Sequence, residues 1–138
     1  MADITITAAN VAVLSADTRV YSGKIGEAMT AGQLCYLDSS DSKYKLSDAS
    51  AAATARVQSV CLLGGAADAY GVFMDFVDEY VTGGTMGSAG TQYVLSATAG
   101  AMCLLSDLST NDYIVTVGYS TSSTQLKPQV AATGIQVA

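Results

Sequence analysis

Residues 26–48, GEAMTAGQLCYLDSSDSKYKLSD, hold the pattern around which the chain is organised. Residues 33–37 are a short run rich in strand formers, residues 38–43 are turn formers, and residues 44–47 alternate apolar and polar side chains. Two strand-like runs separated by turn residues are typical of a β-hairpin. The sequence therefore predicts a hairpin over this stretch.

The same pattern occurs again later in the chain. In the first copy, an Ala-Gly pair lies at 31–32, a Tyr followed by an apolar residue at 36–37, and a Leu-Ser-Asp triplet at 46–48. In the second copy, the corresponding residues lie at 89–90, 93–96 and 105–107. A further strand-like run follows each hairpin, at 56–62 and at 113–119. A chance match is the alternative in a chain this rich in Ala, Gly, Leu and Ser. Two short repeats do not make a solenoid, so we expect one compact domain with an internal quasi-repeat.

Composition narrows the class of protein. The chain has 138 residues, enough for one domain with a real core, and 50% of them are apolar. Only 13% are charged, which is about half of the usual share. Because a lone soluble monomer keeps many charges on its surface, this shortage indicates a surface that faces other protein. A neutral surface covered by Ser and Thr remains the alternative.

Several classes of partner and location are disfavoured. The net charge is −6 and the six basic residues are scattered, whereas nucleic-acid binding needs clustered Lys and Arg. No run of about 18 apolar residues is present. The first residues lack the basic start and apolar block of a secretory signal, so we expect synthesis as a soluble protein in the cytoplasm. Cys35, Cys61 and Cys103 are odd in number and far apart, which favours buried, reduced thiols.

The chain in order predicts about ten short strands. Residues 1–22 form an N-terminal arm or a first strand, and residues 23–138 form a single β domain. Residues 49–54, after a potential N-cap at Asp48, form one or two helical turns or an irregular loop. Residues 70–82 read as one long strand, and residues 125–138, with the only proline, as an edge strand or a tail.

The predicted fold class is therefore all-β. We expect a compact β-sandwich or barrel with an extended N-terminal arm and at most one short helix.

The residues that would carry catalysis are missing. Without any His, neither a Ser-His-Asp nor a Cys-His arrangement is available, and three separated cysteines do not make a zinc site. The glycine-rich residues 83–87 lack the Lys-Ser/Thr of a phosphate loop. We therefore expect no enzyme activity and no cofactor.

Two acidic clusters have alternative interpretations. Asp38 and Asp41 flank a serine-rich turn that offers oxygens to calcium, but the regular spacing and glycine of a calcium loop are missing, which favours an Asx-type turn. Asp75, Asp78 and Glu79 suggest paired hydrolytic carboxylates or, preferably, a solvated face or subunit contact.

Five stretches of sequence together resemble the small β-rich proteins encoded beside the major capsid protein in many tailed bacteriophages. They are ADITITAANV at 2–11, GEAMTAGQ with a following YLD at 26–38, KYKLSDA at 43–49, YVLS with a following Gly at 93–100, and GYSTSSTQL at 118–126. The resemblance covers nearly the whole chain. It departs from the family at Ser59-Val60-Cys61, where most such chains have a Gly before the small apolar residue.

The resemblance implies a capsid cement or decoration protein. Such a protein is an all-β subunit that binds the outside of the expanded head, bridges capsomers and usually clusters as trimers. The implied partners are the major capsid protein and further copies of the chain, and the implied location is the outer surface of the virion. The family offers no catalytic residues.

Candidate contact residues lie in two segments. The arm at residues 2–13 is the first candidate for β-augmentation onto a neighbour, and the strand around residues 72–81 is the second. The residues expected to contact the capsid or another subunit are Ile4, Ile6, Val11, Val13, Phe73, Asp75, Phe76, Asp78, Glu79 and Tyr80. A receptor- or glycan-binding head-fibre or adhesin module is the alternative function. A lipoyl-like carrier is excluded because no Lys lies at a hairpin tip between the expected neighbours.

Overall fold

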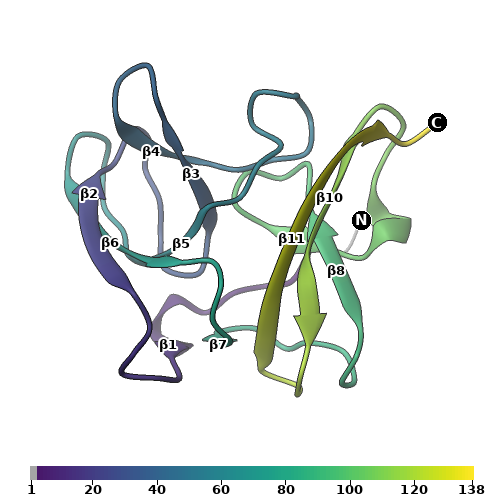
Figure 1. Cartoon of the computed structure of the whole chain (residues 1–138), viewed down its shortest axis with the longest axis horizontal. Coiled ribbons are helices and arrows are strands. Elements are labelled where there is room, and N and C mark those ends of the chain that lie inside the picture. The colour runs from purple at the N-terminus through teal and green to yellow at the C-terminus, as the bar shows by residue number, and fades with distance from the viewer. Residues whose placement is uncertain (1–2) are drawn as a thin grey trace.

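The computed structural model describes residues 3–138, which form eleven β-strands in two antiparallel sheets and two short 3-10 helices (Figure 1). The elements in chain order are η1 Ala8–Asn10, β1 Val11–Val13, β2 Val20–Lys24, β3 Leu34–Asp38, β4 Lys43–Leu46, β5 Ser59–Leu63, β6 Tyr70–Asp75, β7 Tyr80–Thr82, β8 Gln92–Leu95, β9 Met102–Cys103, η2 Leu105–Asp107, β10 Tyr113–Ser120 and β11 Gln125–Gln136. This architecture confirms the predicted all-β class. None of the helices in this part of the chain is long enough to cross a membrane.

The two sheets have the same strand order. The first contains β2 to β6 in the order β2-β6-β5-β3-β4, and the second contains β7 to β11 in the order β7-β11-β10-β8-β9, with β1 added beside β7. Every named neighbouring pair in both sheets is antiparallel. The chain is therefore two copies of one five-stranded unit. We call residues 20–75 the first repeat and residues 80–136 the second repeat.

Equivalent backbone hydrogen bonds support this equivalence of the two repeats. The N–H of Gly32 donates to the carbonyl of Cys61 at 2.8 Å, and the N–H of Gly90 donates to that of Ser120 at 2.7 Å. In return, Cys61 N–H donates to Gln33 O and Ser120 N–H to Thr91 O, both at 2.9 Å. The quasi-repeat seen in the sequence is therefore a repeat of backbone structure.

The Ala-Gly pair has the same role in both copies. In each, the residue after the glycine donates its N–H to the carbonyl three residues earlier, from Gln33 to Thr30 and from Thr91 to Ser88. The glycines at the third position have φ of 94° and 91°. A positive φ at that position is the requirement of a type II turn, which explains why glycine is used.

The two repeats share one core, and the first repeat has another of its own. The shared core includes Leu34, Val60 and Met74 from the first repeat and Tyr93 and Val117 from the second. The separate core lies on the other face of the first sheet and consists of Ile25, Met29, Cys35, Leu46, Cys61 and Phe73.

The first sheet covers its own core because it curls toward closure. A parallel bridge joins Ile25, just beyond β2, to Tyr44 of β4. The Gly26 N–H also donates to the Tyr44 carbonyl at 2.8 Å. Figure 1 shows this curled sheet at the left and the more open strands β8, β10 and β11 at the right. The sequence left open a barrel or a sandwich, and the fold has features of both. The first sheet curls toward closure as in a barrel, and the two sheets share a core as in a sandwich.

One predicted element differs from the structure, and one alternative that the sequence left open is decided. Residues 70–82 are two strands in different sheets, β6 and β7, because the chain turns at residues 76–79. Of the helical turns and the irregular loop that the sequence left open for residues 49–54, the structure has the loop. The Asp48 carboxylate accepts hydrogen bonds from Ser50 N–H at 3.0 Å and Thr54 Oγ1 at 3.1 Å, which stabilises this loop.

Candidate functional site

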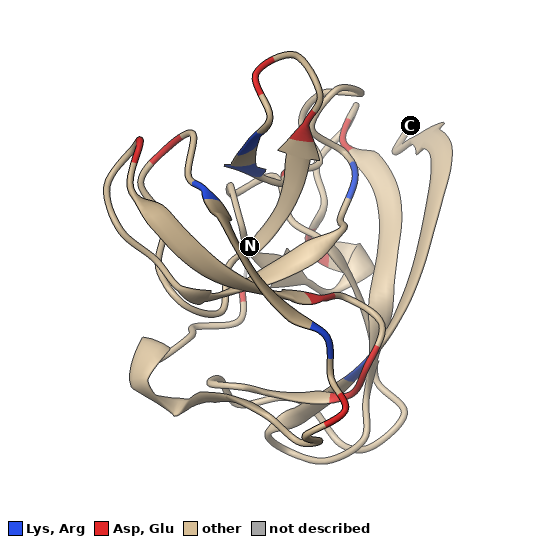
Figure 2. Ribbon diagram, turned by 60° about the vertical axis from the view of Figure 1, so that its left-hand side comes forward, with Lys and Arg blue, Asp and Glu red and all other residues tan. Residues whose placement is uncertain are grey.

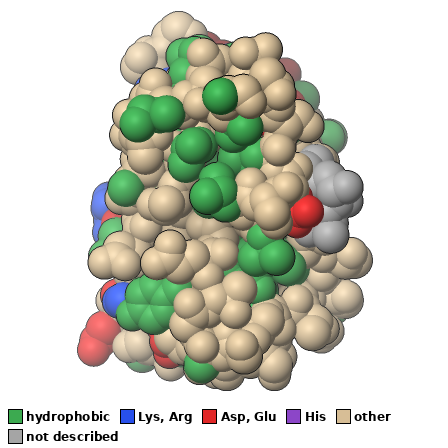
Figure 3. Space-filling model, turned by 90° about the vertical axis from the view of Figure 1, so that its right-hand side faces the viewer, with side chains coloured by type: hydrophobic (Ala, Val, Ile, Leu, Met, Phe, Trp, Pro, Cys, Tyr) green, Lys and Arg blue, Asp and Glu red, His purple; other side chains and the backbone are tan. Residues whose placement is uncertain are grey.

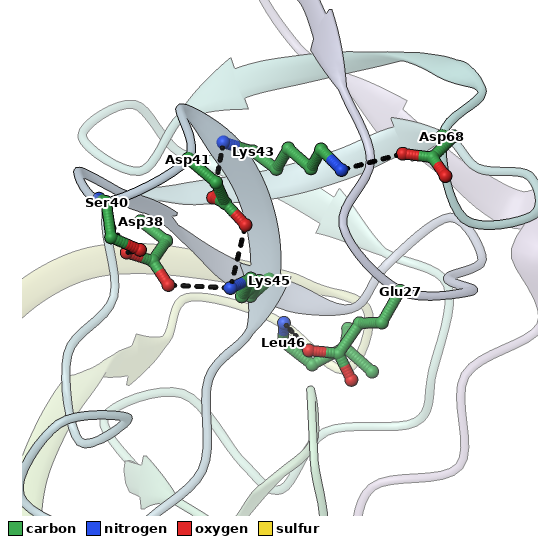
Figure 4. A network of polar contacts seen from close by, with 8 residues as sticks. All are labelled: Glu27, Asp38, Ser40, Asp41, Lys43, Lys45, Leu46 and Asp68. Carbon is green, nitrogen blue, oxygen red and sulfur yellow. Dashed lines mark hydrogen bonds and ion pairs between the residues drawn. The ribbon is translucent and has the colours of Figure 1, made fainter.

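The Asp38 and Asp41 carboxylates bind a lysine of their own hairpin (Figure 4). Lys45 Nζ lies 2.7 Å from Asp38 Oδ2 and 3.1 Å from Asp41 Oδ2. Asp38 Oδ1 accepts the Ser40 N–H at 2.9 Å, which makes the expected Asx-type turn. The bond from Lys45, followed by those from Ser40, holds the pKa of Asp38 well below its usual value. The cluster is therefore a structural ion pair at a hairpin tip.

A second polar cluster surrounds Asp75 at the end of β6. Asp75 Oδ2 accepts a hydrogen bond from Arg19 at 2.9 Å, and the Arg19 guanidinium lies over the Tyr21 ring at 5.0 Å. Tyr21 also shares a hydrogen bond with Ser59, and burial raises its pKa. The groups satisfy one another, and residues 3–138 contain no cluster of three or more Cys, Asp or Glu suited to a metal.

The structure moves three predicted contact residues to the interior. Phe73 and Tyr80 are fully buried and Phe76 is 4% exposed, so they are core residues in this fold and cannot contact a partner. Phe76 and Tyr80 pack edge to face in the shared core. The sequence suggested a surface strand because acidic residues interrupt the run. The aromatic residues are buried because β6 packs against a core on each of its two faces. Asp78 and Glu79 lie half-exposed in the turn before β7.

The N-terminal segment also differs from a free arm. We call residues 3–13 the strap. Its N–H groups at Ile4 and Thr7 donate to Met102 O at 3.0 Å and Gly83 O at 2.8 Å. Its last residues form β1, which pairs with β7 of the same chain. Residues 11–13 are therefore a strand of the domain itself, the second alternative of the sequence analysis, and Val13, 39% exposed, is on the outermost strand of the second sheet.

Glycines make room for the strap. A Cβ on Gly32 would lie 2.4 Å from Ile6 Cγ2, and one on Gly84 would lie 2.6 Å from Ile4 Cγ2. A Cβ on Gly83 would lie 2.7 Å from the Thr7 carbonyl oxygen. Gly32 belongs to the first repeat and the other two glycines to the second. The strap therefore lies across both repeats and holds them together.

An apolar groove lies beside the strap. It has a volume of about 790 Å³ and its walls come from η1, the β2–β3 connection and the end of β5. All of its lining residues are uncharged, and the largest exposed side chain is Leu63, at 59%. The lining residues are Ala8, Ala9, Ala28, Met29, Thr30, Ala31, Gln33, Leu62, Leu63, Gly64, Gly65 and Ala66. A groove of this composition suits an apolar segment of another protein.

Charge is divided unequally between the repeats. Residues 1–79 contain ten acidic and five basic residues, a net charge of −5, whereas residues 80–138 contain only Asp107, Asp112 and Lys127, a net charge of −1. Figure 2 shows most of the charged segments gathered on the curled sheet and its loops. The groove is therefore an uncharged part of the surface, and the second repeat is a part with few charges.

Sequence reasoning missed the groove. Its walls come from three separate stretches, at residues 8–9, 28–33 and 62–66. The available signal was that all three are uncharged and rich in Ala, Gly and Leu. Comparison of the chain with protein-family models and with curated protein sequences gives no match.

Proposed function

We propose that the chain is a structural virion protein that binds the outer surface of an expanded phage capsid and bridges capsomers. The observation that carries this proposal is the uncharged groove beside the strap, with exposed Leu63 at its edge and the outermost strand β1 next to it. The groove offers burial of apolar surface and the strand offers backbone hydrogen bonds, which are the two means of β-augmentation. The resemblance of the sequence to capsid cement proteins supports the same role.

The proposed mechanism is stabilisation by preferential binding. Expansion of the head creates the docking site, so the subunit binds the expanded lattice and not the compact one. A ligand that binds one state stabilises that state by an amount that grows with its concentration over its dissociation constant. Each bound subunit contacts neighbouring capsomers and thereby opposes their separation.

The glycan-binding alternative receives less support. The best aromatic cluster near the surface contains Tyr21 and Tyr44. Arg19 lies over the Tyr21 ring, and Tyr44 is stacked on Phe73 with ring centres 4.1 Å apart. Sugars stack on a free aromatic face, and these contacts occupy faces of both rings.

The test is co-sedimentation of the purified protein with heads assembled without it, in expanded and in compact form. We expect saturable binding to expanded heads only. Leu63→Lys should weaken this binding at least about tenfold, because a charge would be buried against the groove. Val20→Lys, on an exposed β2 residue with 47% exposure, is the matched control and should bind normally. Protein that stays in the supernatant with expanded heads would refute the proposed function.

A further inference from the structure

A second hollow continues the groove along the strap. It has a volume of about 260 Å³ and shares Thr30, Ala31 and Gln33 with the groove. Its remaining walls come from the start of the strap and from residues 98–101 at the tip of the second hairpin. The groove and this hollow are therefore adjacent parts of one depression, which we call the channel.

The shape of the channel suits an extended segment. The strap forms a wall along both of its parts, with Asp3 in the hollow and Ala9 in the groove. Because these two residues are six positions apart, the wall is at most about 20 Å long. Thr30, Leu63 and Thr98 are exposed along the channel, so it is open to the surface. A strand advances about 3.3 Å per residue, and the channel therefore has room for up to about six residues.

The lining of the channel favours a protein segment over a sugar. None of the residues that line it is aromatic, so it lacks the flat surface on which a sugar ring stacks. Most of the lining residues are Ala, Gly, Leu, Ile or Met. Such a surface gains free energy when apolar side chains of a partner displace water from it.

A single carboxylate, that of Asp3, gives the channel a charged end. Asp3 is the only charged residue that lines either part. Within the described part of the chain, its carboxylate accepts one hydrogen bond, from Ser96 Oγ to Oδ1 at 2.6 Å, and forms no ion pair. An occupant that covers this carboxylate removes water from it, and the cost is offset only if the occupant brings an opposite charge. The channel therefore favours a segment with a Lys or Arg at one end.

The wider surface has the same preference. Residues 1–79, which contribute the strap and the whole groove, carry a net charge of −5. The second repeat adds little charge, and Figure 3, which views β8, β10 and β11 from outside, shows most charged atoms near the rim. A negative field attracts a basic segment and repels an acidic one. The carboxylate in the channel and the charge around it therefore favour the same kind of partner.

We propose that the channel binds an extended segment of the capsid protein, with apolar side chains along the groove and a Lys or Arg at the end that meets Asp3. This inference rests on the proposed capsid role and adds the chemistry of the segment that the groove receives. The apolar side chains supply the buried surface. The basic side chain fixes the direction in which the segment runs, because only one end of the channel carries a charge.

The test is the dissociation constant for expanded heads, measured by co-sedimentation over a range of protein concentrations at low and at high salt. Thr98 is exposed in the hollow that contains Asp3, so a charge of either sign can be placed there. Thr98→Lys should weaken binding about tenfold because it meets the basic side chain with a like charge, whereas Thr98→Glu should bind at least as tightly as wild type. Asp3→Asn, whose amide oxygen can still accept the Ser96 hydrogen bond, should weaken binding about fivefold and reduce its dependence on salt.

Ser123→Lys and Ser123→Glu form the matched control, because Ser123 is exposed in the turn before β11 and does not line the channel. These two variants should bind within about twofold of each other, and circular dichroism should show that all five variants are folded. Equal binding of Thr98→Lys and Thr98→Glu, or an equally large difference between the Ser123 variants, would overturn the inference and leave the capsid role intact. Wild-type protein that stays in the supernatant with expanded heads would refute the capsid role and this inference with it.

Discussion

The first and second repeats have the same strand order and equivalent hydrogen bonds, yet their surfaces differ. The first repeat curls until Ile25 reaches Tyr44, and it buries a second core that contains Phe73. The second repeat stays open, and Lys127 is the only charged residue of its strands β8, β10 and β11. Ion pairs cover the first repeat, such as those of Lys45 with Asp38 and of Arg19 with Asp75. One backbone pattern therefore supports two different surfaces: a curled sheet that carries most of the charge and borders the uncharged groove, and an open sheet with little charge.

The glycine turns show the same division on a smaller scale. The Gly32 turn of the first repeat is covered by Ile6 of the strap, whereas a Cβ added at Gly90 in the second repeat would meet nothing within 4 Å. The strap therefore breaks the symmetry between two otherwise equivalent turns. The following predictions test this comparison, from the largest expected effect to the smallest.

Phe73→Ala should remove the largest side chain of the first repeat's own core. We expect the free energy of unfolding to fall by about 3–5 kcal/mol, because the substitution leaves a cavity. Urea unfolding followed by circular dichroism measures this change. The control is Gln129→Ala on β11, where an exposed substitution should change stability by no more than about 0.5 kcal/mol. Equal losses in the free energy of unfolding for the two variants would contradict the difference between the first repeat's own core and the exposed residue on β11.

Gly32→Ala and Gly90→Ala form a matched pair. Both place alanine at a positive φ, which costs about 1–2 kcal/mol. Gly32→Ala should cost a further 1–3 kcal/mol or so, because its Cβ would lie 2.4 Å from Ile6 Cγ2. The urea midpoints of the two variants measure the difference. Equal midpoints would mean that the strap does not pack on the first turn.

Two buried tyrosines differ in their hydroxyl groups. Tyr93 Oη accepts the Gly87 N–H at 2.7 Å, whereas the buried Tyr80 hydroxyl has no partner within residues 3–138. Tyr93→Phe should therefore lower the free energy of unfolding by about 1 kcal/mol, and Tyr80→Phe should be neutral or slightly stabilising. Thermal unfolding of both variants measures this contrast. A clear loss on Tyr80→Phe would show that its hydroxyl is bonded.

Asp38→Asn tests the ion pair of the first hairpin, and the effect should be the smallest because the pair is at the surface. The pKa of Asp38 is lowered in the folded protein, so its stabilisation is present above the unfolded pKa of about 3.9 and is lost as the pH falls. The stability difference between wild type and variant should therefore shrink below about pH 4. Urea unfolding at several pH values measures this. Thr98→Asn, at the uncharged tip of the second hairpin, should show no such pH dependence.

The sequence predicted the local elements better than their assembly. Both hairpins and their repetition could be predicted, because strand formers and turn residues alternate regularly there. The division between β6 and β7 could not, since residues 76–79 contain neither Gly nor Pro to mark the turn. The sequence left an arm and a first strand open for residues 1–22, because the glycines that make room for the strap lie far along the chain, at 32 and 83–84. The burial of Phe73 could not be predicted either, because only the tertiary structure shows that both faces of its strand are covered.

The candidate surfaces could be predicted only in part. The low share of charged residues correctly drew attention to large uncharged surfaces. The sequence did not place them, because the groove is formed by three stretches that lie far apart along the chain.

The most direct test of the account is hydroxyl-radical footprinting of the protein free at low concentration and bound to expanded heads. The account predicts that oxidation falls at Leu63 in the groove. Tyr70 and Val20, exposed on the charged repeat, should be oxidised as in the free protein. Protection of Tyr70 and Val20, with Leu63 unchanged, would contradict the assignment of the groove as the contact surface.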